Sequence, residues 1–332
     1  MTPVTRLLLP FSVLFAIVVF VRRALYRMRL LPVSRIHVPV VVIGNITAGG
    51  SGKTPLVLWV VEHLRAAGLR PGIVSRGYGG RVASRREPAC EVSIGSDPAS
   101  VGDEPLLLAR RAHCPVWVGV DRVAVCRALL LQHPECDVLV LDDGLQHYAL
   151  ARDIEIAVVD ARGVGNGLLF PAGPLREPVS RLREVDAVVY NGPAGLAGPA
   201  GHSMRLEGEE FINLTNASRS ATAVALGSKR VHAVAGIGDP ARFFRHLAAL
   251  GFDVVPHPFP DHHAYAASDF AFAESLPVVM TEKDAVKCSG FAQPHFWMLP
   301  VRAELDAEFG PKLDAMLRGK RCRESQGRRS GH

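Results

Sequence analysis

The sequence TAGGSGKT at residues 47–54 lies between an apolar run at residues 38–43 and a segment with helical periodicity. A strand, a glycine-rich loop and Lys-Thr at the start of a helix form the phosphate-binding loop, or P-loop, of nucleotide enzymes. In that loop, backbone N–H groups and the helix N-terminus face the phosphates. An ordinary glycine turn explains neither the strand before it nor the amphipathic run after it. The predicted nucleotide-binding residues are Thr47, Ala48, Gly49, Gly50, Ser51, Gly52, Lys53 and Thr54.

Two residues of this loop and one acidic strand end carry the predicted phosphate chemistry. Lys53 is expected to reach the β- and γ-phosphate oxygens of ATP, and Thr54 to offer its hydroxyl to Mg²⁺. The run VLVLDDG at residues 138–144 reads as a buried strand ending in Asp142. A carboxylate there can hold Mg²⁺ directly or through water, although an Asp at a strand end is also a common turn or cap residue. Asp143 either shares in catalysis at the metal or orients a neighbour.

Composition narrows the class of protein. The chain has 332 residues, of which 48% are hydrophobic, so it can bury a large core and favours two domains. A net charge of +6 suits acidic or phosphorylated partners. Nucleic acid is not expected, because the arginines are dispersed, aromatic residues are few and no nucleic-acid motif is present. The six cysteines show neither CxxC nor metal-ligand spacing, which indicates reduced thiols in a cytosolic compartment.

The N-terminus carries a second strong pattern. Residues 7–21 contain no charge and are followed at once by Arg22, Arg23, Arg27 and Arg29. The run is short for a spanning helix, and arginines stand where a signal peptide would have its cleavage site. We predict a retained membrane anchor that either crosses the bilayer as a tilted helix or lies in one leaflet, with the rest of the chain cytoplasmic. The ordinary alternative is a core helix.

Alternating apolar runs and helical segments predict an α/β fold, with a mostly parallel P-loop sheet and a second, smaller α/β lobe. The expected strands of the first sheet are residues 38–43, 72–75, 115–120, 138–141, 154–159 and 187–190, with a helix at 122–132. The second set comprises strands at 231–235, 254–255, 278–281 and 296–301, with a helix at 241–250. A Gly/Pro-rich boundary lies at 191–201. The predicted division is an anchor at 1–30, a kinase domain at 31–205, a smaller lobe with a β linker at 206–317 and a basic disordered tail at 318–332.

Two common P-loop classes lack their distinguishing residues. Ala48 stands where membrane-partitioning ATPases carry an extra lysine, and TEKD at residues 281–284 departs from the NKxD sequence with which GTPases read guanine. With these two classes set aside, the sequence indicates a kinase-like or ATP-hydrolysing enzyme at the membrane. The alternatives are a membrane-associated GTPase or metallochaperone, and a nucleotide-gated membrane adaptor that hydrolyses ATP without phosphorylating lipid.

Nine motifs in order resemble the tetraacyldisaccharide 4′-kinases, the lipid A 4′-kinase family of Gram-negative bacteria. They are GNITAGGSGKTP at 44–55, SRGYGG at 75–80, GDEP at 102–105, GVDR at 119–122, LDDGLQH at 141–147, GPLREP at 173–178, GIGDP at 236–240, FPDHHAY at 259–265 and TEKDAVK at 281–287. Thr47 at the first P-loop position is usual in that family. The resemblance implies transfer of the ATP γ-phosphoryl to the 4′-hydroxyl of an acylated glucosamine disaccharide 1-phosphate, which makes lipid IVA at the cytoplasmic face of the inner membrane. It also implies a β linker between two lobes, for which we expect residues 210–214 and 297–301.

The same resemblance assigns the remaining site residues. Asp103 is implied as the base that accepts the hydroxyl proton, with His262 beside it from the second lobe; which of His262 and His263 points inward rests on the family pattern. Without the resemblance, Asp103 reads as the N-cap of a helix that begins near Glu104. Arginines suit the 1-phosphate and the ATP phosphates; Arg81 is a further candidate for this task. The implied substrate-binding residues are Arg76, Tyr78, Arg122, Gln146, Arg176 and Glu177. The expected partners are this lipid and the membrane surface, with no obligate protein partner.

Overall fold

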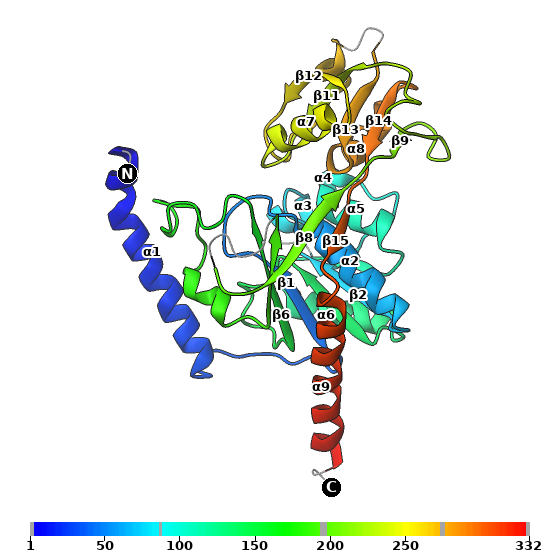
Figure 1. The fold of residues 1–332 in the computed structure, drawn as a ribbon. Helices are drawn as coiled ribbons and strands as arrows, with labels where there is room; N and C mark the ends of the chain where they lie inside the picture. Colours follow the sequence, from blue (N-terminus) through cyan, green and yellow to red (C-terminus); the bar gives the residue numbers. More distant parts are fainter. Residues whose placement is uncertain (1–2, 86–87, 193–197, 273–275, 330–332) are drawn as a thin grey trace.

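A parallel β-sheet with a P-loop at its centre forms the larger of two α/β lobes (Figure 1). The computed structural model describes residues 3–85, 88–192, 198–272 and 276–329. The strand order of this sheet is β15-β8-β7-β6-β1-β5-β2-β4-β3, and only the two edge strands β15 and β3 run antiparallel to their neighbours. The strands are β1 (Val40–Gly44), β2 (Pro71–Ser75), β3 (Cys90–Glu91), β4 (Val116–Val118), β5 (Val138–Asp142), β6 (Ile154–Asp160), β7 (Ala187–Asn191), β8 (His202–Glu207) and β15 (Arg302–Leu305).

Helices cover both faces of this sheet, which explains why its central strands are continuous apolar runs. Val41 and Ile43 of β1 pack into the cluster that includes α2 (Lys53–Ala66), whereas Val40 and Val42 pack on the opposite side with α6 (Arg122–Gln132). The other helices of the large lobe are α3 (Arg81–Arg85), α4 (Pro98–Val101), α5 (Asp103–Arg111), the 3-10 helix Val179–Arg183 and α9 (Phe309–Arg329).

The small lobe is built on a second sheet with the order β10-β9-β14-β13-β11-β12. Its strands are β9 (Phe211–Asn213), β10 (Ser220–Ala221), β11 (Arg230–Ala235), β12 (Asp253–Pro258), β13 (Val278–Thr281) and β14 (Phe296–Leu299). Its helices are α7 (Pro240–Ala249), α8 (Glu282–Cys288) and the 3-10 helices Ala267–Phe270 and Ser289–Phe291. The neighbouring strands β12, β11, β13 and β14 are parallel. The predicted fold class is confirmed.

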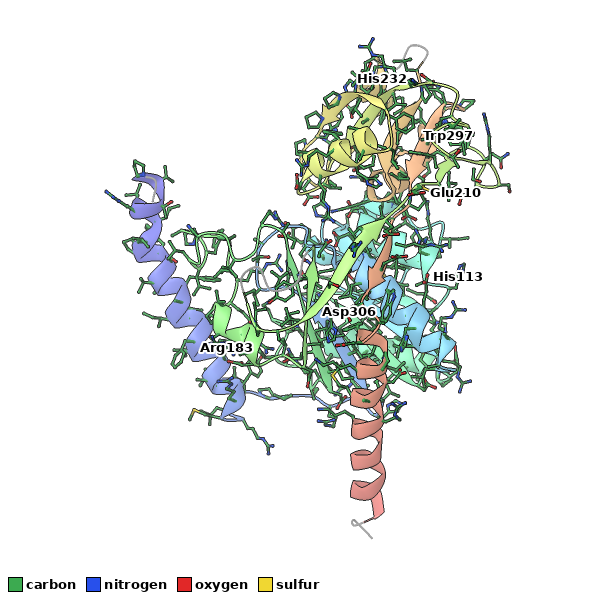
Figure 2. All side chains as sticks on the ribbon, in the orientation of Figure 1. His113, Arg183, Glu210, His232, Trp297 and Asp306 are labelled. Carbon is green, nitrogen blue, oxygen red and sulfur yellow. The ribbon has the colours of Figure 1, made fainter. Side chains whose placement is uncertain are left out.

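The strands that join the lobes differ from the prediction. Of the segments expected in the linker, 210–214 and 297–301, residues 211–213 form β9 and residues 297–299 belong to β14, both inside the small sheet. The antiparallel pair β8 and β15 carries the chain between the lobes instead, so the predicted boundary at residues 205/206 falls inside β8. In Figure 2, Glu210 and Trp297 lie at the small lobe and Asp306 lies in the large one. Part of the expected boundary stretch, residues 193–197, is outside the described residues.

The C-terminal segment also differs from the prediction. Phe309, Leu313 and Leu317 of α9 are buried in the core of the large lobe, although residues 206–317 were assigned to the small one. The helix continues through Arg329, where a disordered tail was expected; residues 330–332 lie outside the described chain. Arg, Lys, Glu and Gln are favourable helix formers, so a polar composition alone does not exclude a helix that starts from a buried turn.

The N-terminal helix α1 (Pro3–Arg27) lies along one side of the large lobe and leaves most of its apolar surface uncovered (Figure 1). Leu7 is 74% exposed and Phe20 is 73% exposed, and within the described part of the helix only Ser12 is buried. The length and composition of α1 suffice to cross a membrane. Arg23 and Arg27 tie its end to Glu184. Exposure on this scale excludes the core-helix alternative and is consistent with a membrane anchor.

Deleting residues 1–21 should move most of the protein from the membrane-bound to the soluble fraction, because each apolar CH₂ withdrawn from lipid loses about 0.8 kcal/mol. Co-sedimentation with vesicles of phosphatidylethanolamine and phosphatidylglycerol measures this change. The melting temperature should stay close to that of the full chain. A truncated protein without a cooperative melting transition would show that α1 is part of the core.

Candidate active site

The glycine-rich loop lies at the carboxyl end of β1 and leads into α2, as the sequence predicts. Gly52 precedes α2 with a φ of 88°, and a Cβ there would lie 2.4 Å from Asn191 Nδ2. The left-handed backbone and the close approach therefore both require glycine. Lys53 begins α2, and its Nζ lies 3.4 Å from Asn45 Oδ1 and 3.4 Å from Asp143 Oδ1. The loop thus presents a lysine held ready beside a carboxylate.

Asp142 ends β5 directly beside the P-loop strand, because it pairs with Ile43 of β1. The side chain is buried; its Oδ2 accepts a hydrogen bond from Ser75 Oγ at 3.1 Å, and its Oδ1 has no hydrogen-bond partner among the described residues. Burial, with repulsion from Glu104, raises the pKa of the Asp142 carboxyl to about 7. A buried oxygen without a partner is costly, so this residue fits a cation ligand.

The next residue, Asp143, has the opposite environment. Its backbone is left-handed, with a φ of 53°, and its carboxylate lies 3.0 Å from Arg176 Nη1 as well as near Lys53. Burial alone would raise the pKa of Asp143, but the charges of Lys53 and Arg176 outweigh it and lower that pKa. Asp143 is therefore a charged residue that positions two cations.

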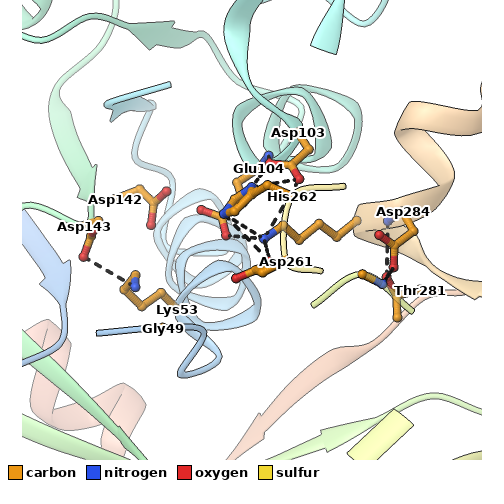
Figure 3. A network of polar contacts seen from close by, with 12 residues as sticks. Gly49, Lys53, Asp103, Glu104, Asp142, Asp143, Asp261, His262, Thr281 and Asp284 are labelled. Atoms are coloured by element: carbon orange, nitrogen blue, oxygen red, sulfur yellow. Dashed lines mark hydrogen bonds and ion pairs between the residues drawn. The ribbon is translucent and has the colours of Figure 1, made fainter. Parts of the chain in front are cut away.

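Asp103 and His262 meet across the two lobes (Figure 3). His262 Nδ1 lies 3.0 Å and 3.1 Å from the two carboxylate oxygens of Asp103, whose side chain is 4% exposed. The N-cap of α5 is Gly102, so Asp103 is the first residue of the helix and the capping interpretation is wrong. Asp103 Oδ1 does accept the backbone N–H of Glu104, at 2.9 Å. His262, like Asp143, has a left-handed backbone, with a φ of 61°, a strained conformation that is frequent at functional sites.

Each member of this pair favours the charged form of the other. Burial would raise the pKa of Asp103, but the hydrogen bond from His262 and the charges of Lys283 and Lys287 lower it. The hydrogen bond to Asp103 raises the pKa of His262, against burial and the charge of Lys283. The neighbouring His263 turns elsewhere, with its Nε2 3.0 Å from Asp269 Oδ2.

Two cavities meet at the P-loop. One, of about 470 Å³, lies between the loop and the small lobe and is lined by Thr54, Asp160, Arg242 and Phe243, among others. The other, of about 930 Å³, lies between the loop and the anchor helix and includes Phe15, Val18 and Arg22 of α1. The residues common to both linings are Gly50, Lys53 and Glu104. Lys53 thus lies at the border of the two cavities and can contact a ligand in either one.

All of the predicted substrate-binding residues line the larger cavity, together with Asp143 and His262. They are Arg76, Tyr78, Arg122, Gln146, Arg176 and Glu177. The Arg122 guanidinium is buried and donates to the Gly119 carbonyl at 2.8 Å. Burial, with repulsion from Arg76, lowers the pKa of Arg122 to about 10. The cavity thus combines cationic walls with the apolar side of α1.

The remaining predicted residues have structural partners. Gln146 Nε2 donates to the Asn45 carbonyl at 3.0 Å, which ties the acidic strand end to the P-loop. Glu177 is buried and accepts a hydrogen bond from Tyr148 at 2.8 Å. Arg81, the further arginine considered for phosphate binding, forms an exposed ion pair with Asp97.

The sequence interpretation missed Lys283, which reaches the catalytic pair from the small lobe. TEKD at residues 281–284 was compared with the guanine-reading sequence and counted among the family motifs, but no role was predicted for its lysine. Thr281 caps α8, and the buried Asp284 accepts the Gly236 N–H at 3.0 Å, so both side chains are occupied within the small lobe. Lys283 Nζ instead lies 3.1 Å from Glu104 Oε1 of the large lobe. Glu104 and Lys283 belong to two motifs, GDEP and TEKDAVK, that are distant in sequence and come together only in the fold. No local sequence pattern therefore indicates the role of Lys283.

A P-loop with an adjacent acidic strand end, a carboxylate–histidine pair and a second cavity beside the phosphate site define a P-loop phosphotransferase with a second lobe at its active site. The family described as Tetraacyldisaccharide-1-P 4′-kinase matches residues 4–318. The chain belongs to this family.

Relatives and a solved structure agree with that membership. The chain is 54% identical over 307 residues to a tetraacyldisaccharide 4′-kinase of Azoarcus sp. (strain BH72), covering 91% of this chain and 89% of that protein. It is 53% identical over 308 residues to the Aromatoleum aromaticum enzyme of the same name, covering 91% and 90%. It also resembles a crystal structure described as the "apo" form of LpxK from Aquifex aeolicus in complex with ATP, with a TM-score of 0.78, 28% identity, and coverage of 95% of this chain and 99% of that one.

Replacing Asp142 by Asn should stabilise the protein more at pH 8 than at pH 5, in the absence of nucleotide and Mg²⁺. The pKa of Asp142 rises from its ordinary 3.8 to about 7 on folding, so stability is lost as the pH rises through this range and the carboxyl ionises. Melting temperatures at both pH values measure the effect. Asp253→Asn, at an exposed position, is the matched control. An equal effect of Asp142→Asn at both pH values would contradict this account.

Proposed function

We propose that this chain transfers the γ-phosphoryl group of ATP to the 4′-hydroxyl of a tetraacyl glucosamine disaccharide 1-phosphate, the step that makes lipid IVA in lipid A biosynthesis. The observation that carries this proposal is the meeting of the two cavities at Lys53. The smaller cavity, between the P-loop and the small lobe, suits ATP. The larger one, with arginines and the anchor helix in its walls, suits a phosphorylated lipid.

The P-loop side supplies phosphate binding. Lys53, Thr54 and the backbone N–H groups of residues 47–54 would hold the β- and γ-phosphates. The Thr54 hydroxyl and the unpartnered, buried Asp142 Oδ1 fit Mg²⁺. When bound, that ion would neutralise charge on the transferring phosphoryl group. Asp143 would keep Lys53 and Arg176 in place through its ion pairs.

The other side prepares the acceptor. The proton of the sugar hydroxyl would pass to the Asp103–His262 pair, in which Asp103 holds the imidazole and supports its charge. Arg76, Arg122 and Arg176 line the cavity and can neutralise phosphate groups of the acceptor and of ATP. Tyr78, Gln146 and Glu177 complete the wall, the last two through the structural contacts described above.

The anchor helix brings the enzyme to its substrate. A tetraacylated lipid leaves the bilayer only at a high free-energy cost, so the reaction has to occur at the membrane surface. Arg22 and Arg23 follow the apolar run and favour the cytoplasmic face of the bacterial inner membrane, as the positive-inside tendency predicts. Since Phe15 and Val18 also line the larger cavity, the acyl chains can reach it along α1.

The decisive experiment is phosphoryl transfer from [γ-³²P]ATP to the lipid A precursor disaccharide 1-phosphate in detergent micelles. Labelled lipid is the expected product, and Lys53→Ala should reduce its formation at least about a hundredfold, because a charge on the transferring phosphoryl is lost. Preference for GTP over ATP would favour a GTPase, and ATP hydrolysis without labelled lipid would favour a membrane adaptor. Near-normal transfer by folded Lys53→Ala would contradict the P-loop role.

Asp103→Asn should retain ATP binding and reduce kcat by about 10² to 10⁴, because the amide keeps the shape of the side chain and loses the charge that supports the imidazole when it accepts the proton. The Asn side-chain oxygen can still accept the Glu104 N–H, so a residue with only this structural role would tolerate the change. Single-turnover transfer at saturating ATP measures the rate, and nucleotide titration provides the control. Full activity would remove Asp103 from the proton path.

A further inference from the structure

Lys283 connects the lobes at the catalytic pair. It lies on α8 of the small lobe, and its side chain is 15% exposed. Its Nζ lies 3.0 Å from Asp261 Oδ1, 3.1 Å from Glu104 Oε1 and 3.4 Å from His262 Nε2. Figure 3 shows the acidic groups of this network gathered around His262. An ammonium group has three N–H donors and no acceptor, so these contacts use all of its hydrogens.

These contacts determine the tautomer of His262. Lys283 can only donate, so His262 Nε2 has to carry the lone pair. Asp103 is ionised because its pKa is lowered, and a carboxylate can only accept, so His262 Nδ1 has to carry the proton. A hydrogen bond from Lys283 to Nε2 therefore requires the neutral imidazole, with its proton on Nδ1 and its lone pair at Nε2.

The charged groups around His262 come from three segments. Asp103 from α5 faces Nδ1, Asp261 precedes His262 in the same loop, and Lys283 reaches Nε2 from α8; the Tyr78 ring packs on the imidazole with centroids 5.1 Å apart. The hydrogen bond to Asp103 raises the pKa of His262, and burial and the Lys283 charge oppose it. Without Lys283, the imidazole would be protonated at a higher pH and would lose its ability to accept a proton.

We propose that Lys283 is a positioning residue for the Asp103–His262 pair, which it keeps in the proton-accepting form by donating a hydrogen bond to His262 Nε2. This inference rests on the proposed kinase function. As the hydroxyl O–H bond breaks and a proton binds Nε2, the hydrogen bond from Lys283 to Nε2 is lost. Glu104 and Asp261 then retain the ammonium group beside the new imidazolium.

The test is the pH dependence of kcat for lipid phosphorylation by the full chain in detergent micelles, for wild type, Lys283→Met and Lys283→Arg. Lys283→Met should lower kcat about 10- to 100-fold at pH 7 and move the acidic limb upward by about one pH unit. Lys283→Arg retains the charge and should keep the limb near its wild-type position. A limb that stays in place in Lys283→Met, or moves equally in Lys283→Arg, would overturn the proposal.

Lys287→Met is the matched control. Lys287 lies on α8, the same helix as Lys283, and its Nζ is 3.7 Å from Asp103 Oδ2. Among the described residues its ion pairs are with Asp103 and Asp284 and not with His262. Its loss should change turnover while leaving the limb near the wild-type position. An equal upward shift in this variant would show a general charge effect and overturn the specific role of Lys283.

A second measurement reads the tautomer in the wild-type protein and needs no turnover. Nitrogen-15 NMR of histidine-labelled wild type at pH 7.5 should show His262 with its proton on Nδ1 and an unprotonated Nε2, the signal being assigned by its loss in His262→Gln. A proton on Nε2 would overturn the proposal. Absence of lipid phosphorylation by wild type would instead overturn the proposed function, and the tautomer would still be read independently.

Discussion

The contact between α5 and α8 is the constraint on which the active site depends, because it joins the two lobes through partly buried charges. Arg111 Nη1 lies 2.8 Å from both carboxylate oxygens of Glu282, and Lys283 pairs with Glu104. Buried ion pairs gain little over hydrated ions, since desolvation offsets much of their attraction. These pairs therefore add only modestly to the stability of the contact between the lobes.

Much of the fold follows from local patterns, and the connection between the lobes does not. The strands β1, β2 and β4 to β7 are recognisable because they are short, buried and apolar, whereas the two-residue edge strand β3 was not predicted. The P-loop is recognisable because its chemistry is contiguous in sequence. β8 has buried residues only in its first half, at His202 and Met204, and exposed Arg205 and Glu207 in its second half, so its sequence resembles a loop until it pairs with β15. Lys283 was missed for the same reason: its role arises from Glu104 and His262, which are distant in sequence.

The anchor helix is part of the site as well as its attachment to lipid. Ser12 Oγ donates to the Leu169 carbonyl at 2.7 Å, and the Phe15 and Phe170 rings lie 6.0 Å apart, so α1 is fixed to the large lobe at mid-length. Its arginine-rich end is fixed at Glu184. Because these contacts are made on one side only, the opposite side remains free for lipid. One side of α1 can therefore line the larger cavity while its exposed apolar side faces lipid.

The adjacent carboxylates Asp142 and Asp143 at the end of β5 lie in different environments because the chain turns between them. Asp142 still has strand geometry and points into the buried layer between β1 and β2, where no cation of the chain meets its Oδ1 among the described residues. Asp143 adopts a left-handed backbone and turns toward Lys53 and Arg176. Asp142 Oδ1 is therefore without a partner among the described residues, whereas the Asp143 carboxylate is already paired with two cations. In the proposed reaction, Asp142 would be the carboxylate that joins the Thr54 hydroxyl in holding Mg²⁺, and Asp143 would keep Lys53 in place before ATP binds.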